Sequence, residues 1–314
     1  MVKRLVLASH RGYCAGVDRA VEMLERALEL HGAPVYARKQ IVHNTHVVGG
    51  FEERGVVFVE SELDVPAGGT VVFSAHGVAP KVHENARARR LETIDATCPL
   101  VSKVHAEARH YAARGFTVFL IGHAGHEEVE GTMGEAPGAI LLVETVADAE
   151  RVRPPQADRL AYVTQTTLSV DETNAIAAVL RRRFPAIEAP AKEDICYATT
   201  NRQQAVKQLL DRIDLLLVIG SRNSSNSKRL VEVGRAGGVE AHLIEDEGTI
   251  DERWLAGVES VGITSGASAP DFLVGRVVTW FRDRGVAEVE TLDAGHEDVA
   301  FRLPVEMRQL PTSS

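Results

Sequence analysis

The chain has 314 residues, of which 45% are hydrophobic and 25% are charged, as in ordinary soluble globular proteins. Its formal net charge of −9 argues against a nucleic-acid-binding protein but allows a local pocket for an anion. Residues 1–12 contain too short an apolar run for a signal peptide, and the run at 215–220 is far shorter than the ~18 residues that suggest a membrane helix. We therefore expect a cytoplasmic protein with no membrane segment and no nucleic-acid partner.

Three segments of the chain each contain a β-prone or apolar stretch, then a cysteine, then a helical pattern. The cysteines are Cys14, Cys98 and Cys196, and the helices predicted after them are 15–32, 99–115 and 197–213. Pro99 falls at a first helical position, where its missing N–H has no cost. So few cysteines do not make a disulfide framework. They are either unrelated buried thiols or members of one shared site.

Further strands follow each of these helices in the same order. The predicted strands are 33–42, 56–61 and 70–77, then 117–122, 139–145 and 159–167, then 214–220, 240–246 and 258–268, with further helices at 171–184 and 269–281. Strands that alternate with helices predict mainly parallel sheets covered by helices. We expect an α/β protein with three similar domains, at 1–97, 98–195 and 196–283, and a C-terminal tail at 284–314.

Polar residues follow the predicted strands at matched positions. The interval from each cysteine to the polar residue after the next strand is 28 or 29 positions, and the pairs are Cys14 with His43, Cys98 with His126, and Cys196 with Ser224. The last strand of each segment also ends in polar residues, which are His76, Thr166 with Thr167, and Ser268. Because ligands bind at the carboxyl ends of strands in such sheets, we expect the three cysteines to meet at one centre.

Three equivalent thiols at helix N-termini favour a metal site over unrelated buried thiols. Thiolates at helix starts have lowered pKa values and are good ligands. A structural zinc site normally takes four protein ligands. A [4Fe–4S] cluster held by only three thiolates keeps one iron open, as catalysis on a bound substrate requires. The residues alone leave the cluster and zinc both open.

The neighbouring polar residues favour an anionic substrate. His43, His76 and His126 can donate hydrogen bonds to phosphate, and more strongly when protonated. Ser224, Ser225 and Asn226 immediately precede a helical pattern, where backbone N–H groups bind anions. The alternative for the serines is a plain helix cap, and Ser268 can also be read as a cap.

Glu128 lies two residues after His126 and is the candidate general acid. Negative charge from a cluster and a phosphate would push its carboxyl group toward the protonated form. Thr166 or Thr167 can orient this group or bind the substrate. The alternative is that Glu127, Glu128 and Glu130 form a solvated acidic helix start.

Longer motifs surround these residues. They are "RGYCAGVDRA", "IVHN", "FSAHGV", "DATCPLVSKVH", "GHAGHEEVEGTMGE", "TQTTLSVDET", "ICYATTNRQ", "SRNSSNSKRL" and "ITSGASAP". With these motifs in this order, residues 5 to 280 resemble the 4-hydroxy-3-methylbut-2-enyl diphosphate reductases. The chain has Glu127 where that family often has Pro, and Tyr13 where it often has Phe. Neither departure replaces a functional residue of the family.

The resemblance implies a pseudo-threefold trefoil of three α/β domains around one [4Fe–4S] cluster. It implies cluster ligands at Cys14, Cys98 and Cys196, pocket histidines at His43, His76 and His126, proton delivery by Glu128 with Thr166 beside it, and diphosphate contacts at Ser224, Asn226 and Ser268, with Ser225 in the same loop. We expect the exposed iron to be lost on oxidation, which leaves a [3Fe–4S] cluster.

The implied reaction is reductive dehydroxylation of 4-hydroxy-3-methylbut-2-enyl diphosphate to isopentenyl and dimethylallyl diphosphate, the last step of the non-mevalonate isoprenoid pathway. The substrate hydroxyl is expected to bind the open iron, with electrons from a ferredoxin or flavodoxin. The competing hypotheses are a non-redox dehydratase that uses the same iron, an iron–sulfur sensor without catalysis, and a structural zinc protein.

Overall fold

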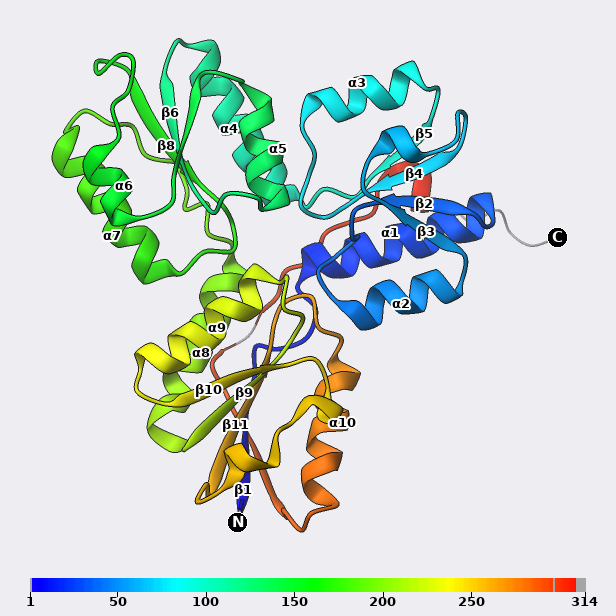
Figure 1. Ribbon diagram of the computed structural model, residues 1–314, viewed down its shortest axis with the longest axis vertical. Coiled ribbons are helices and arrows are strands. Elements are labelled where there is room, and N and C mark those ends of the chain that lie inside the picture. Colours follow the sequence, from blue (N-terminus) through cyan, green and yellow to red (C-terminus); the bar gives the residue numbers. More distant parts are fainter. Residues whose placement is uncertain (1, 296, 309–314) are drawn as a thin grey trace. The chain divides into compact units, whose positions relative to one another are not determined.

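The computed structural model describes residues 2–295 and 297–308, and Figure 1 labels its elements. The chain forms two compact units. The first combines the described residues of Met1–Cys14, His43–Val47 and Cys196–Val299, and the second those of Ala15–Val42, Val48–Ile195 and Ala300–Ser314. Together they contain three separate parallel sheets. The predicted α/β class with parallel sheets is confirmed.

The first unit contains a five-stranded sheet in the order β10-β9-β11-β1-β12. Its strands are β1 (Arg4–Ala8), β9 (Leu215–Ile219), β10 (Glu240–Ile244), β11 (Ser260–Ser265) and β12 (Glu288–Leu292). Its helices are α8 (Tyr197–Leu209), α9 (Ser225–Ala236) and α10 (Asp271–Arg282). Helices α8 and α9 cover one face of this sheet, and α10 covers the other (Figure 1).

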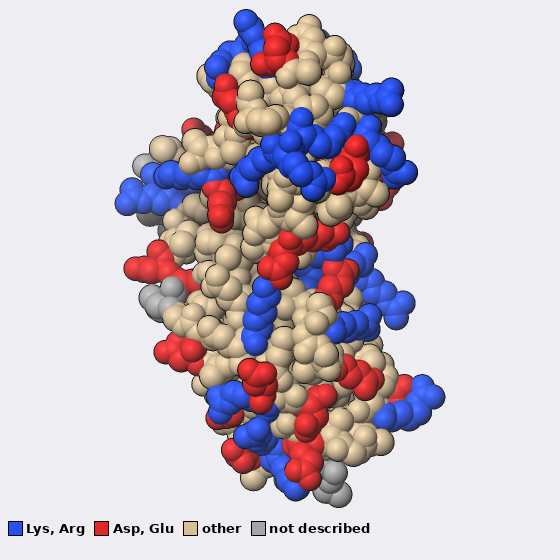
Figure 2. Space-filling model, turned by 90° about the vertical axis from the view of Figure 1, so that its left-hand side faces the viewer, with Lys and Arg blue, Asp and Glu red and all other residues tan. Residues whose placement is uncertain are grey.

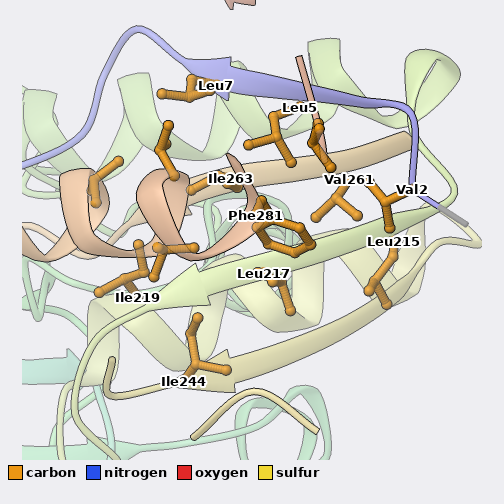
Figure 3. Packing of buried hydrophobic residues seen from close by; sticks show 14 of the residues in the cluster. Val2, Leu5, Leu7, Leu215, Leu217, Ile219, Ile244, Val261, Ile263 and Phe281 are labelled. Atoms are coloured by element: carbon orange, nitrogen blue, oxygen red, sulfur yellow. The ribbon is translucent and has the colours of Figure 1, made fainter. Parts of the chain in front are cut away.

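Alternate residues of β9, which lies between β10 and β11, pack on opposite faces of this sheet, as the two-residue period of a strand requires. Leu215, Leu217 and Ile219 pack with Phe281 of α10 (Figure 3). Leu216 and Val218 point the other way and pack against α8 and α9. Because helices cover both faces, the strand is apolar at every position instead of alternating with polar residues.

Sheet membership differs from the predicted domains at both ends of the chain. Strand β1, which falls in the predicted domain 1–97, pairs in parallel with β11, with Leu5 opposite Val261. Strand β12, which falls in the predicted tail 284–314, pairs with the other edge of β1. The sheet of residues 196–283 therefore includes both ends. For β1, the reason is that local pattern shows that a segment is a strand but not which distant strand it pairs with. The strand at β12 was itself missed, because the sequence predicts a polar, irregular tail there.

The second unit contains two smaller parallel sheets, in the orders β3-β2-β4-β5 and β7-β6-β8. Their strands are β2 (Val35–Arg38), β3 (Val56–Val59), β4 (Thr70–Phe73), β5 (Glu92–Asp95), β6 (Thr117–Ile121), β7 (Ile140–Val143) and β8 (Leu160–Thr164). The remaining helices are α1 (Ala15–His31), α2 (Thr45–Glu53), α3 (Pro80–Ala88), α4 (Pro99–Ala113), α5 (Glu127–Glu135), α6 (Val146–Arg151), α7 (Val170–Arg183) and α11 (Val305–Arg308).

The helices predicted after the three cysteines are present as α1, α4 and α8, so this part of the sequence pattern is confirmed. Pro99 is the first residue of α4. Gly32 and Gly115 follow α1 and α4 with φ of +70° and +77°, values that favour glycine at a helix end. Residues 191–196 form no strand, although a β-prone stretch was expected before Cys196.

The surface carries both signs of charge. Figure 2 shows basic and acidic side chains side by side on one face of the molecule. Ion pairs also join neighbouring helices, as Arg182 of α7 does with Glu150 of α6. Within the described ranges, no helix combines the length and the apolar character that a membrane span needs.

Two phenylalanines of α10, one buried and one exposed, allow a matched test of the core between α10 and the sheet of the first unit. Phe281 is 1% exposed within the core of Figure 3, whereas Phe272 is 57% exposed. We expect Phe281→Ala to destabilise the first unit by about 3–5 kcal/mol, because it removes buried apolar surface and leaves a cavity. Phe272→Ala is the control and should change stability little. Urea unfolding followed by tryptophan fluorescence measures this unit, because Trp254 and Trp280 both lie in it.

Candidate functional site

Cys14 and Cys196 lie at the carboxyl-end edge of the sheet in the first unit. The N–H of Cys14 donates to the carbonyl oxygen of Ala267, just beyond β11, at 3.1 Å. Cys196 is the N-cap of α8, and its sulfur accepts the N–H of Thr199 at 3.4 Å. Helix α8 precedes a strand of the parallel sheet, so its N-terminus lies at the carboxyl ends of the strands.

A Ser/Asn loop occupies the same edge, after β9. Ser224 is the N-cap of α9, and its hydroxyl accepts the N–H of Ser227 at 3.3 Å. Ser225 and Asn226 are the first two residues of α9. Asn226 is only 4% exposed, and neither atom of its amide has a hydrogen-bond partner among the residues that the structure describes. A buried amide in this state is suited to bind a polar ligand.

Two glycines allow this loop to pack closely. A Cβ on Gly220 or Gly266 would lie 2.2 or 2.0 Å from the hydroxyl oxygen of Ser227. No larger residue fits at either position without displacing that serine. Their Cβ-free backbone thus places the N-terminus of α9 directly against the ends of β9 and β11.

His43 and Ser268 contact each other in the first unit. The Ser268 hydroxyl donates to the backbone carbonyl of His43 at 2.8 Å. The Asn223 amide nitrogen lies 3.3 Å from Nδ1 of the His43 ring. Ser268 is not a helix cap, because the N-cap of α10 is Pro270. This serine instead fixes the His43 segment.

In the second unit, Glu128 is a buried carboxyl group held by one residue. Its side chain is 2% exposed and accepts the Thr166 N–H at 2.6 Å and the Thr166 hydroxyl at 3.0 Å. Burial raises the pKa of Glu128, although the bonds from Thr166 oppose this. The alternative of a solvated acidic helix start is therefore wrong for Glu128, while Glu130 is half-exposed. The Thr167 hydroxyl accepts from the Gln165 amide at 2.9 Å, so the orienting threonine is Thr166.

His126 is the N-cap of α5 and is electrically neutral. Its Nδ1 accepts the N–H of Glu128 at 3.2 Å. Burial, together with the neighbouring His76, lowers the pKa of His126 to about 3. The proton of the neutral ring is then on Nε2, which is a hydrogen-bond donor. His126 can therefore donate to an anion without carrying a charge of its own.

His76 and Cys98 lie together after β4. The N–H of Cys98 donates to the carbonyl of Ala75 at 3.0 Å. The His76 ring meets the His126 ring edge to face, with centroids 5.8 Å apart. His76 Nδ1 also lies 3.4 Å from the carboxylate of Glu127. Burial raises the pKa of Glu127, but His76, Lys39 and Ser74 together lower it by more, so its pKa is below the ordinary value.

Sequence reasoning missed residues that support the site residues of the second unit. The sequence offers Glu127 only as part of an acidic helix start and as a departure from a family pattern. His105 was passed over, yet it is buried with Nδ1 2.8 Å from the Glu135 carboxylate, and Gly77 and Gly131 both pack against its ring. The available signal was the position of these glycines: Gly77 directly follows His76, and Gly131 lies three residues after Glu128 on α5.

Each unit therefore gathers its own set of the predicted site residues. The first holds Cys14, Cys196, His43, Ser224, Ser225, Asn226 and Ser268, and the second holds Cys98, His76, His126, Glu128, Thr166 and Thr167. Two cysteines belong to the first set and one to the second. The convergence of all three stays a prediction.

Comparisons with known proteins were made on this basis. A family model described as "LytB protein" matches residues 5–282. The chain is 58% identical to the 4-hydroxy-3-methylbut-2-enyl diphosphate reductase of Acidothermus cellulolyticus, over 98% of this chain and 91% of that protein. It is 55% identical to the protein of the same name from Nocardia farcinica, with the same coverage. A solved E-1-hydroxy-2-methyl-but-2-enyl-4-diphosphate reductase from Plasmodium falciparum matches with a TM-score of 0.94 and 39% identity, over 98% of this chain and 97% of that chain.

Proposed function

The chain belongs to the LytB protein family, and from this premise we propose how its residues reduce 4-hydroxy-3-methylbut-2-enyl diphosphate to isopentenyl and dimethylallyl diphosphate. The allylic C–O bond breaks, two electrons and two protons enter, and the oxygen leaves as water. This is the last step of the non-mevalonate pathway, as stated for a solved relative with 31% identity to this chain. The observation that carries the proposal is the buried Glu128 carboxyl group held by Thr166.

The cysteines fit an iron–sulfur cluster. Cys14, Cys98 and Cys196 are partly exposed, none forms a disulfide in the described chain, and each directly precedes a helix N-terminus. Thiolates suit iron–sulfur clusters, and helix N-termini favour negative charge. We propose that the three hold a [4Fe–4S] cluster, which becomes [3Fe–4S] on oxidation. When bound, it supplies single electrons and an iron open to the substrate.

The diphosphate is proposed to bind through neutral and backbone donors. In the first unit these are the N-terminal N–H groups of α9, the Asn226 amide, and the side chains of Ser224, Ser225, His43 and Ser268. In the second unit, Nε2 of neutral His126 is a donor, and His76 and Thr167 lie in the adjoining loops. Helix N-termini and neutral donors bind anions without burying additional cations.

Glu128 is proposed to deliver the proton that converts the leaving hydroxyl into water. A carboxyl group with a raised pKa holds its proton to higher pH than an ordinary one and serves as a general acid. Thr166 fixes both carboxyl oxygens and so sets the direction of transfer. We further propose that a ferredoxin or flavodoxin in the cytoplasm supplies the electrons.

An anaerobic assay with the cluster-loaded protein tests the function. We expect brown protein, given a strong one-electron donor, to consume 4-hydroxy-3-methylbut-2-enyl diphosphate and release both products. Turnover without any reductant would favour the dehydratase. Colourless protein that carries one zinc would overturn the cluster, and loaded protein that consumes no substrate would favour the sensor.

Asn226 offers a test of diphosphate binding that separates function from stability. Because its amide is buried without a partner in the described structure, we expect Asn226→Ala to leave the melting temperature of the ligand-free protein unchanged or raised. Loss of a hydrogen bond to a charged group should raise the KM about tenfold or more. Asn174→Ala, on the exposed side of α7, is the control. A lower melting temperature with an unchanged KM would show a structural role instead.

A further inference from the structure

The loop before Cys14 is held by a cation from the helix that follows Cys196. Arg202 of α8 is fully buried, and its guanidinium donates to the carbonyl oxygen of Gly12 at 2.8 Å. It also donates to the carbonyl of Ala198 at 3.1 Å. The Glu297 carboxylate lies 3.5 Å away and balances the charge. A buried guanidinium is stable only when it is bonded in this way.

The loop before Cys98 is held in the same manner from the helix that follows Cys14. The guanidinium of Arg19, on α1, donates to the carbonyl oxygen of Thr97 at 3.1 Å and to that of Ala96 at 3.4 Å. These are the two residues directly before Cys98. Here too the acceptors are main-chain carbonyls, so the contact fixes the path of the backbone and not merely a side chain.

The loop before Cys196 is held from the helix that follows Cys98. The ammonium group of Lys103, on α4, donates to the carbonyl oxygens of Lys192 at 2.8 Å and Glu193 at 3.3 Å. It also pairs with the buried carboxylate of Asp194 at 2.8 Å. The other oxygen of Asp194 accepts the N–H of Thr164, at the end of β8, at 2.9 Å.

These three contacts link the three cysteine segments in a cycle. Arg19, Lys103 and Arg202 stand five or six positions after Cys14, Cys98 and Cys196, and each holds the loop of a different cysteine from the one it follows. Unrelated surface ion pairs would show neither this similar spacing nor the shared choice of carbonyls shortly before a cysteine. The pattern therefore belongs to the same threefold repeat as the cysteines.

We propose that Arg19, Lys103 and Arg202 are positioning residues that fix the three cysteine loops in a cyclic order and so hold the thiols ready for the cluster. This inference rests on the proposed function, because it assumes that the thiols bind the cluster. It adds three residues that act through the backbone before each proposed ligand. Supports of metal ligands of this kind contribute about 10- to 100-fold to metal affinity.

The sharpest test follows each cysteine separately in the metal-free full chain. Arg19→Met, Lys103→Met and Arg202→Met remove the donors but keep most of the side-chain volume. Iodoacetamide alkylation, read by mass spectrometry, should speed up most at Cys98, Cys196 and Cys14 respectively. General loosening of the fold would instead speed up all three cysteines in every variant, and that result would overturn the proposal.

Matched controls come from the same helices. Arg26 of α1 pairs with Glu22 and Glu29 of its own helix, and Lys207 lies five residues beyond Arg202 on α8. Arg26→Met and Lys207→Met should leave all three alkylation rates unchanged. If Arg202→Met does not fold, Arg202→Lys keeps the charge but loses the two-pronged donor, and Cys14 should still be the cysteine most affected.

Cluster retention gives the second measurement. In loaded holoprotein, each methionine variant should lose iron to a ferrous chelator about 10- to 100-fold faster than the unaltered chain. If all three variants lost iron at the rate of the unaltered chain, the positioning role would be overturned while the proposed function stayed intact. If the unaltered chain itself takes up no iron and sulfide, the proposed function fails instead, so the two failures are distinguishable.

Discussion

Glu128→Gln should nearly abolish turnover while leaving the fold intact. Glutamine has the same size and can still accept the Thr166 N–H, but it has no proton to deliver to the leaving hydroxyl. General acids contribute about 10²- to 10⁴-fold to rate, so we expect a decrease of that size in kcat with a KM within a few-fold of the original. Single-turnover reduction of cluster-loaded protein under anaerobic conditions measures this directly.

The pH dependence of stability provides an independent check on the same residue. Burial raises the pKa of Glu128 above its ordinary value of 4.5, so the folded state binds this proton more tightly than the unfolded state. Its contribution to stability is therefore complete below pH 4.5 and is lost as the pH rises through the raised pKa. Because glutamine does not titrate, the Glu128→Gln protein should gain stability relative to the original chain over that window.

The control for this substitution is Glu84→Gln, which changes an exposed carboxylate on α3 paired with Lys81. It should alter neither kcat nor the pH profile of unfolding. Full turnover by Glu128→Gln would show that the proton comes from another group. If the stability of the original chain and that of the Glu128→Gln protein changed with pH in the same way, Glu128 would lose its proton in the folded state as readily as in the unfolded state.

Cys196→Ser should prevent binding of the proposed iron–sulfur cluster without weakening the helix that begins beside it. The Cys196 sulfur accepts the N–H of Thr199 as the cap of α8, and serine is a better N-cap than cysteine. A loss of bound iron therefore cannot be assigned to an uncapped helix. We expect colourless protein with little iron or sulfide, no measurable reduction of substrate, and an unchanged far-ultraviolet circular dichroism spectrum.

Ser227→Ala serves as a control for the serine chemistry, since it also removes a hydroxyl near a helix N-terminus but at no cysteine. It should leave the iron content unchanged even if it weakens diphosphate binding. Full iron and sulfide content in the Cys196→Ser protein would contradict the assignment of this cysteine as a ligand. The same substitution at Cys14 and Cys98 should give the same result, because the three are proposed to be equivalent.

Local features of this chain were predictable because short-range forces decide them. Pro99 at the first turn of α4 and Ser224 as the cap of α9 follow from the hydrogen-bonding needs of helix ends. The apolar run of β9 follows from burial on both faces of a parallel sheet. The matched spacing after each cysteine indicated the repeat, and the alternation of strands and helices in the repeat predicted the parallel sheets that the structure contains. The repeat also contained Arg19, Lys103 and Arg202, whose contacts with the cysteine loops no local pattern reveals.

The sequence by itself therefore determined the α/β class, the helix after each cysteine and the family. Tertiary structure alone decided that β1 pairs with β11 across more than half of the chain, because strand pairing depends on the path of the whole backbone. It alone decided that Glu128 is buried beside Thr166 and not solvated, and that Ser268 bonds the His43 carbonyl instead of capping a helix. The physical reason is the same in each case. Burial and pairing between distant residues are set by long-range packing, which leaves no mark on the neighbours along the chain.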